Sequence, residues 1–157
     1  ITVNGERVGV DVDFPRDMGL IIETPGFLPN MTGVKNLEIL ASLNKKIGLE
    51  QIAAAIRRVG LDPLMEKPVG KYSLGMRQRL GIAQAIMEDP ALLILDEPLN
   101  GLDKHGVREM RQLIKGLKEQ GKTILLASHN QGDIDELCDT VCEMDAGVMT
   151  MIREESI

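Results

Sequence analysis

The chain has 157 residues, 43% of them hydrophobic and 27% charged, which is enough for one domain with a sizeable core. Its formal net charge of −6 disfavours a nucleic-acid partner, because binding to a phosphate backbone needs a basic surface. No stretch suggests a membrane span, and no signal peptide is expected. Cys138 and Cys142 are too few for a disulfide framework or a closed zinc site, so we expect both to be reduced and buried.

Strands and helices are predicted in turn along the first part of the chain. In chain order these elements are a strand over 1–8 that either ends in a turn at Asn4-Gly5 or continues past it, a strand over 19–22, a helix that starts after 30–32, a helix over 50–59, and a helix that Ser73 caps and that runs to about residue 88. The helical block from 30 to 88 therefore interrupts a series of strands.

The second part alternates strand and helix more regularly. The predicted elements are strands over 92–95, 123–127, 140–144 and 148–152, and helices over 104–119 and 133–137. Strand–helix–strand order implies right-handed crossovers and a parallel sheet. The fold class that follows is α/β, with a helical segment inserted between two strands of the sheet.

Two carboxylates end the most apolar strand of the chain. The sequence LLILDEP at 92–98 has four apolar residues in a row, which predicts a strand buried on both faces of the sheet. Asp96 and Glu97 at its end are costly unless a cation meets them, and a Mg²⁺-nucleotide at the carboxyl edge of the sheet would do so. In such a site Asp96 holds the Mg²⁺ shell and Glu97 orients or deprotonates the attacking water. The alternative is a chance acidic pair at a strand end.

Three further segments accompany this strand in a fixed order. Ser73 and Gly75 open a helix upstream, where a hydroxyl, free amides and the helix dipole make an anion site. Downstream come the turn 101–103 and His129, which follows the strand 123–127. Each has a plainer interpretation: an ordinary helix cap at Ser73, an N-cap at Asp103, and a structural histidine.

One segment matches the phosphate-loop pattern GxxxxGK[ST] but is rejected. It spans 116–123, where a helix is predicted to end at Gly121 and a strand to begin at Thr123. A working phosphate loop needs the opposite order, so that the free amides of a helix N-terminus face the phosphates.

Taken in order, the segments at 73–80, 92–98, 101–103 and 128–129 resemble the second half of an ATP-binding-cassette (ABC) transporter ATPase. The resemblance implies a partial P-loop NTPase (RecA-like) fold, a parallel sheet with an inserted helical subdomain and with the Walker A strand and helix missing. It implies a single partial domain over 1–157, with 1–25 and 89–157 as the sheet core and 26–88 as the helical insertion that carries the signature helix. In that family the missing strand lies between the strands that match 123–127 and 140–144.

The resemblance also assigns roles to residues. Glu97 and His129 are expected to be catalytic and Asp96 to bind Mg²⁺, while Ser73, Gly75 and Asp103 would contact ATP across a dimer. Glu23 stands where most members have glutamine, and it could still bind Mg²⁺. Tyr72, Leu74 and Met76 depart from the commonest signature, and the variant fits subunits of antibiotic and lantibiotic export systems.

The function implied is an ATP-binding and ATP-hydrolysing subunit of an ABC transporter, in export, with ATP and Mg²⁺ as cofactors. Its expected partners are a membrane permease subunit and a second ATPase domain in a homo- or heterodimer, and its expected place is the cytoplasmic inner face of the membrane. The chain alone is expected to bind nucleotide weakly, not to hydrolyse ATP, and to form a strand-swapped oligomer. Two alternatives stay open: a non-transport ABC-type ATPase in DNA repair, chromosome maintenance or translation, and a non-catalytic interaction module.

Overall fold

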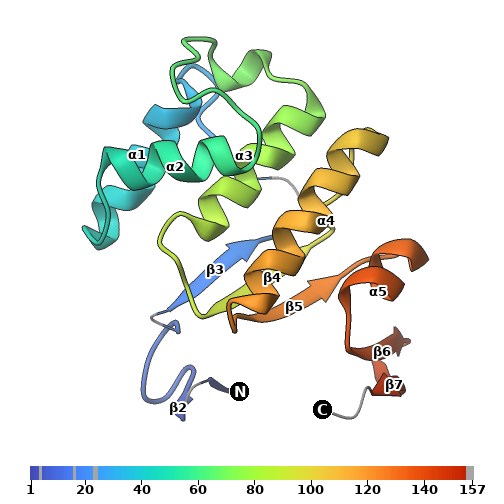
Figure 1. The fold of residues 1–157 in the computed structure, drawn as a ribbon. Helices are drawn as coiled ribbons and strands as arrows, with labels where there is room; N and C mark the ends of the chain where they lie inside the picture. Colours follow the sequence, from blue (N-terminus) through green and yellow to red (C-terminus); the bar gives the residue numbers. More distant parts are fainter. Residues whose placement is uncertain (4, 16, 23–24, 155–157) are drawn as a thin grey trace.

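A three-stranded parallel sheet forms the centre of the molecule (Figure 1). The computed structural model describes residues 1–3, 5–15, 17–22 and 25–154. The sheet has the order β3 (Met18–Ile21), β4 (Leu92–Asp96), β5 (Thr123–Ala127). Its register places Leu93 of the central strand opposite Gly19 on one side and Ile124 on the other. The predicted α/β class with a parallel sheet is confirmed.

The chain between β3 and β4 is helical, as predicted. Its elements are α1 (Gly33–Asn44), α2 (Leu49–Arg58), the 3-10 turn η1 (Val69–Lys71) and α3 (Leu74–Ile86). Thr32 caps α1 by accepting a hydrogen bond from the Lys35 N–H, and Ser73 caps α3 in the same way from the Met76 N–H. The division of the chain into sheet core and insertion at residues 26 and 88 stays a prediction.

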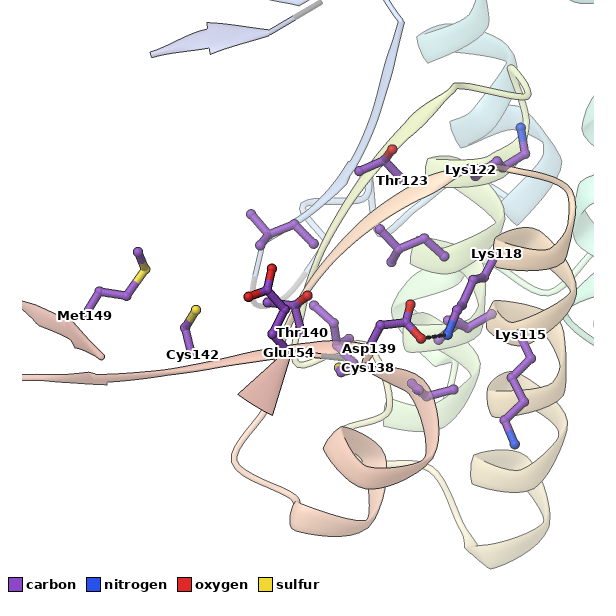
Figure 2. A pocket seen from close by; sticks show the side chains of 15 residues that line it. Lys115, Lys118, Lys122, Thr123, Cys138, Asp139, Thr140, Cys142, Met149 and Glu154 are labelled. Atoms are coloured by element: carbon purple, nitrogen blue, oxygen red, sulfur yellow. Dashed lines mark hydrogen bonds and ion pairs between the residues drawn. The ribbon is translucent and has the colours of Figure 1, made fainter. Parts of the chain in front are cut away.

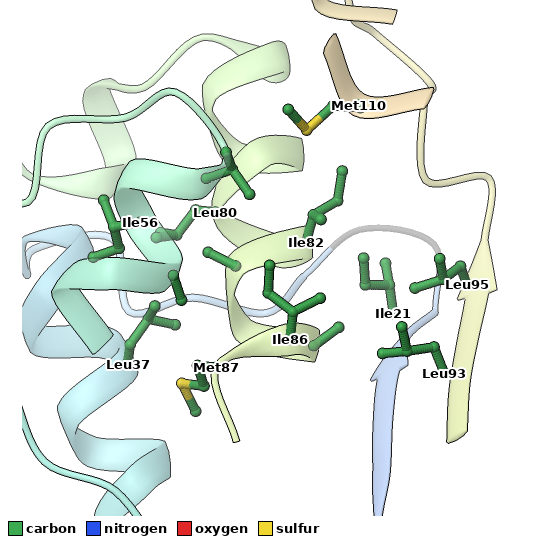
Figure 3. Close-up of a cluster of buried hydrophobic side chains, with 14 of the residues drawn as sticks. Ile21, Leu37, Ile56, Leu80, Ile82, Ile86, Met87, Leu93, Leu95 and Met110 are labelled. Carbon is green, nitrogen blue, oxygen red and sulfur yellow. The ribbon is translucent and has the colours of Figure 1, made fainter. Parts of the chain in front are cut away.

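One continuous hydrophobic core joins the helical segment to the sheet (Figure 3). Leu37 of α1 and Ile56 of α2 pack among the helices, where they are almost fully buried. Ile86 of α3 lies on the side of the helix that faces the sheet and shares the cluster with Ile21 of β3 and Leu93 of β4. Helix α3 therefore belongs to both parts and fixes the insertion on the strands.

The chain after β4 crosses the sheet and ends in a hairpin. Helix α4 (Lys104–Glu119) runs alongside the strands, roughly antiparallel to β5 (Figure 1), and buries Met110, Ile114 and Leu117. The short helix α5 (Gln131–Leu137) follows β5 and begins two residues earlier than predicted, because Asn130 caps it. The last strands, β6 (Thr140–Asp145) and β7 (Val148–Glu154), pair antiparallel with each other.

The sheet is covered on one face, not on two. Leu93 and Leu95 are buried, whereas Leu92 and Ile94 are only half-buried and Leu125 of β5 is 62% exposed. The prediction that 92–95 is buried on both faces is therefore wrong. Within the described residues the apolar core that includes α3 and α4 lies against one face only, and a strand's side chains alternate between faces.

An open groove separates the parallel sheet from the terminal hairpin. Strand β5 pairs with β4 along one edge, and among the described strands β6 pairs only with β7. The space between them, about 920 Å³, is lined by parts of α4, β5, α5 and the hairpin (Figure 2). Cys142 lies exposed on this hairpin, so the expectation that both cysteines are buried is wrong for Cys142, while Cys138 is half-buried.

The remaining elements agree with the sequence. Strands β1 (Thr2–Val3) and β2 (Glu6–Arg7) pair as a small antiparallel hairpin, and Asn4 of the predicted Asn-Gly turn lies outside the described residues. The rejected phosphate-loop match is confirmed as a helix-to-strand junction, since α4 ends at Glu119, Gly121 has a φ of +84° and β5 begins at Thr123. No described helix has the length and hydropathy needed to cross a bilayer.

Candidate active site

The two carboxylates of 92–98 lie at the carboxyl end of the central strand. Asp96 is the last residue of β4, and among the described residues its carboxylate has no hydrogen-bond or ion-pair partner. Glu97 follows with a φ of +47°, in the left-handed region that non-glycine residues seldom occupy. Its N–H still donates to the Ala127 carbonyl of β5, 2.9 Å away. The chain therefore turns sharply at Glu97 while the residue stays attached to the sheet, which is typical of strain held at a functional site.

The Glu97 carboxylate meets His129 from the next strand. Its Oε1 accepts a hydrogen bond from the His129 backbone N–H at 2.9 Å and lies 2.7 Å from the imidazole Nδ1. An ionised carboxylate can only accept, so Nδ1 carries the proton in this contact and Nε2 stays available to another group. The Glu97 side chain is 31% exposed and that of His129 is 79% exposed. A ligand can therefore reach both.

Helix α3 is joined to the carboxyl end of β4 by a buried side chain. Gln78 is buried, and its Nε2 donates to the Glu97 carbonyl oxygen at 3.0 Å, which the Asn100 N–H also approaches at 3.1 Å. Sequence reasoning gave Gln78 no role. It stands between two arginines in a polar run, and no spacing or pattern marks it as a buried contact.

The N-terminus of α3 packs on the turn before α4. A Cβ on Gly75 would lie 3.1 Å from the Gly101 carbonyl oxygen, and a Cβ on Gly101 would overlap the Leu74 side chain. Ser73 is exposed beside this contact, and its Oγ is the helix cap. The carboxylate of Asp103 caps α4 by accepting from the Gly106 N–H at 2.7 Å. The structure thus brings Ser73 and Gly75 to the turn 101–103, and it places Asp96 with Glu97 and His129.

Of the two predicted Mg²⁺ ligands, Glu23 and Asp96, the structure describes only Asp96. Glu23 lies outside the described residues. Asp96 fits a Mg²⁺ ion that also binds a nucleotide, because Mg²⁺ in such sites takes one or two protein carboxylates and completes its shell with water and phosphate oxygens. Within the described ranges no group of three or more His, Cys, Asp or Glu side chains could hold a metal alone. The donor set therefore suits a metal that arrives with a phosphate ligand.

The groove beside β5 is separate from the site formed by Asp96, Glu97 and His129. Its lining residues include Lys118, Cys138 and Asp139, and none of the predicted site residues is among them. A 2.5 Å ion pair between Lys118 and Asp139 crosses it (Figure 2).

Comparison with known proteins agrees with this arrangement. The family model described as ABC transporter matches residues 1–100. YybJ, an ABC transporter ATP-binding protein of Bacillus subtilis, is 44% identical over 147 residues, which cover 94% of this chain and 67% of the relative. The bacitracin transport ATP-binding protein BcrA of Enterococcus faecalis is 47% identical over 131 residues, covering 83% of this chain and 42% of the relative. The lantibiotic transport ATP-binding protein SrtF of Streptococcus pyogenes is 36% identical over 141 residues, covering 88% and 60%.

The chain belongs to the ABC transporter family of ATP-binding proteins. It spans 42% to 67% of the length of these three relatives. The resemblance seen in the signature and carboxylate segments is confirmed, and the relatives include ATP-binding proteins of bacitracin and lantibiotic transport.

Proposed function

We propose that the protein to which this chain belongs hydrolyses ATP to drive export, with Glu97 as the general base. The observation that carries the proposal is the Glu97–His129 pair at the carboxyl end of β4, beside the carboxylate of Asp96, which has no partner among the described residues. All three relatives named above carry names of transport proteins, and two of those names specify bacitracin and lantibiotic transport. Bacitracin-like or lantibiotic-like peptides are the cargo class that we infer.

In this proposal each residue has a distinct task. Glu97 accepts a proton from the water that attacks the terminal phosphate, and its position is held by the His129 N–H and by Gln78. His129 leaves Nε2 available, and in the imidazolium form, in which both ring nitrogens carry a proton, Nε2 would donate to a phosphate oxygen. Asp96 would hold Mg²⁺, which supplies charge stabilisation to the phosphates when bound. Ser73 and Gly75 offer the N-terminus of α3 to the phosphates of a second ATPase domain.

The partners are part of the proposal. We infer a permease subunit in the membrane and a homo- or heterodimer of ATPase domains, with the protein at the cytoplasmic face of the membrane. The described residues hold no strand-to-helix phosphate loop, so we assign the hydrolysis to the whole subunit and expect weak nucleotide binding by the 157-residue chain alone. For that chain alone we also infer self-association through the free edge of β5.

Replacing Glu97 by glutamine in the full-length subunit tests the catalytic role. The variant Glu97→Gln keeps an oxygen that can accept from His129 and removes only the basic carboxylate, so we expect the ATP turnover number to fall about 100-fold or more. Binding of Mg-ATP should persist. Phosphate release and nucleotide titration measure the two quantities.

Glu66→Gln is the matched control, because Glu66 is exposed in the loop between α2 and η1. Equal turnover in both variants and the unsubstituted protein would remove Glu97 from the reaction. A subunit that never hydrolyses ATP, with or without its permease, would favour the non-catalytic interaction module instead.

A further inference from the structure

The loop that carries His129 is fixed by its neighbours, not by burial of the histidine. Residues 128–130 connect β5 to α5, and the imidazole is largely exposed. The Asn130 N–H donates to Ser128 Oγ at 3.1 Å, and Asn130 Oδ1 accepts from the Gly132 N–H at 2.9 Å. The loop is therefore folded on itself around Ser128, and the position of the histidine depends on what holds that serine.

A buried carboxylate holds Ser128. The Ser128 hydroxyl donates to Oδ2 of Asp133, 3.3 Å away, and Asp133 is only 5% exposed. A buried carboxylate is costly unless it is paired and hydrogen-bonded. Asp133 therefore requires a cation in its immediate surroundings.

That cation is Arg111, which lies in the middle of α4. Its Nε donates to Asp133 Oδ1 at 2.9 Å, Nη2 donates to the same oxygen, and Nη1 donates to Glu136 Oε2 at 2.6 Å. The hydrogen bond from Arg111 to Asp133 raises the pKa of the guanidinium above its ordinary value. A Cβ on Gly132 would lie 3.0 Å from Nη2, so the glycine leaves room for this approach.

The place of Arg111 is set by the core. Met110 and Ile114, which flank it on α4, are buried among the side chains of the central cluster. The guanidinium therefore belongs to a helix whose position the core fixes. Its hydrogen bonds to Asp133, and the hydrogen bond of Ser128 to Asp133, hold the loop 128–130 against that helix. Nothing in the roles assigned above uses Arg111 or Asp133.

Resting on the proposed function, we propose that Arg111 and Asp133 are positioning residues for ATP hydrolysis, which act through Ser128 to hold His129 on the Glu97 carboxylate. The contact they support has two parts, the His129 N–H at 2.9 Å and Nδ1 at 2.7 Å from the same oxygen. Displacements near 1 Å at a catalytic group are enough to slow a reaction substantially. Loss of the guanidinium should therefore slow ATP hydrolysis and leave the affinity for nucleotide unchanged.

The first test is kinetic, in the full-length subunit. Arg111→Ala should lower kcat about tenfold and leave KM for Mg-ATP unchanged. In a His129→Ala background the same substitution should have no further effect, because its route to the reaction is gone. Lys115→Ala is the matched control: Lys115 also joins α4 to α5, through Glu136 at 2.9 Å, but no hydrogen bond or ion pair connects it to Asp133 among the described residues. Its kcat should stay within about twofold of the unsubstituted value.

The second test does not need activity. The amide hydrogen exchange of His129 should accelerate in Arg111→Ala and remain slow in Lys115→Ala, since only the former releases the loop. If Arg111→Ala fails to fold, Ser128→Ala breaks the same connection while keeping the Arg111–Asp133 pair, and it should show the same acceleration.

The outcomes separate the two proposals. Unchanged exchange at His129, or a loss of kcat that adds fully to that of His129→Ala, would overturn the positioning role. A faster exchange in a subunit that hydrolyses no ATP would support the structural link and would overturn the proposed function instead.

Discussion

At the scale of single residues, a few ionic contacts join parts of the chain that are far apart in sequence. Arg79 of α3 donates to Glu109 of α4 at 2.6 Å and to the Val59 carbonyl at the end of α2 at 2.7 Å. The Arg79 side chain is largely buried at 16% exposure, whereas that of Glu109 is 42% exposed. The hydrogen bond from Arg79 lowers the pKa of Glu109 below its ordinary value of 4.5, and His105 adds a smaller effect in the same direction.

This lowered pKa predicts acid sensitivity. The folded protein favours the charged form of Glu109, so its contribution to stability is complete above the unfolded-state pKa and is lost as the pH falls through the lower folded-state value. Glu109→Gln should therefore reduce the free energy of unfolding at pH 7 and flatten its decline below about pH 4.5. Urea unfolding between pH 3 and 7 measures this, with Glu119→Gln on the same helix as the control. Parallel pH profiles for all three proteins would show that the ion pair contributes nothing.

At the scale of elements, the approach of α3 to β3 depends on a residue without a side chain. A Cβ on Gly19 would overlap the Ala85 carbonyl oxygen of α3 and lie 2.7 Å from the Leu93 side chain. Backbone cannot move aside as a flexible side chain can, so the strand and helix must separate if the position is filled. This contact matters for the site because α3 also carries Gln78 to the Glu97 carbonyl.

Gly19→Ala is therefore expected to destabilise the protein by about 3 kcal/mol. Gly116→Ala is the matched control, since Gly116 lies inside α4 and, beyond its chain neighbours and the backbone of its own helix, no described atom lies within 4 Å of an added Cβ. There the substitution should stabilise the protein by roughly 0.5–1 kcal/mol, because alanine favours a helix over glycine. Chemical denaturation gives both values. Similar stability of the two variants would mean that β3 and α3 lie further apart than described.

At the scale of the whole molecule, the groove beside β5 divides the described structure into a packed body and a terminal hairpin (Figures 1 and 2). No described strand pairs with the second edge of β5, which leaves backbone groups open to pairing there, and Leu125 on this strand is 62% exposed. Exposed strand edges with apolar side chains pair readily with other chains. A second chain paired with this edge would bury the backbone groups and the Leu125 side chain together.

The 157-residue chain, studied alone, should therefore associate in a concentration-dependent way. Size-exclusion chromatography with light scattering should give a mass above that of the 17.2 kDa monomer. Leu125→Lys should shift the mass toward the monomer, because a charge on an exposed strand edge opposes pairing. Leu64→Lys serves as the control at another exposed leucine, 83% exposed and away from the groove lining. A chain that stays monomeric at every concentration would contradict the inferred self-association.

The elements of the fold could largely be predicted from the sequence, because hydrophobic periodicity and capping residues are local signals. Ser73, Asp103 and Gly121 mark a helix start, a helix start and a helix end, and the structure has each where the pattern predicted it. The burial of 92–95 was predicted wrongly. An apolar run shows that a strand can be covered on both faces, but only the surrounding layers decide whether it is.

The sequence by itself determined the order of the elements and the residue types that can meet a metal and a phosphate, since both depend on local spacing. Only the tertiary structure decided which of these residues meet. The contact of His129 with Glu97, the hydrogen bond of Gln78 to the Glu97 carbonyl and the pairing of Arg111 with Asp133 join residues 19 to 32 positions apart. No local pattern encodes such contacts, because they arise when the core packs α3 and α4 against the sheet and brings separate chain segments to one edge.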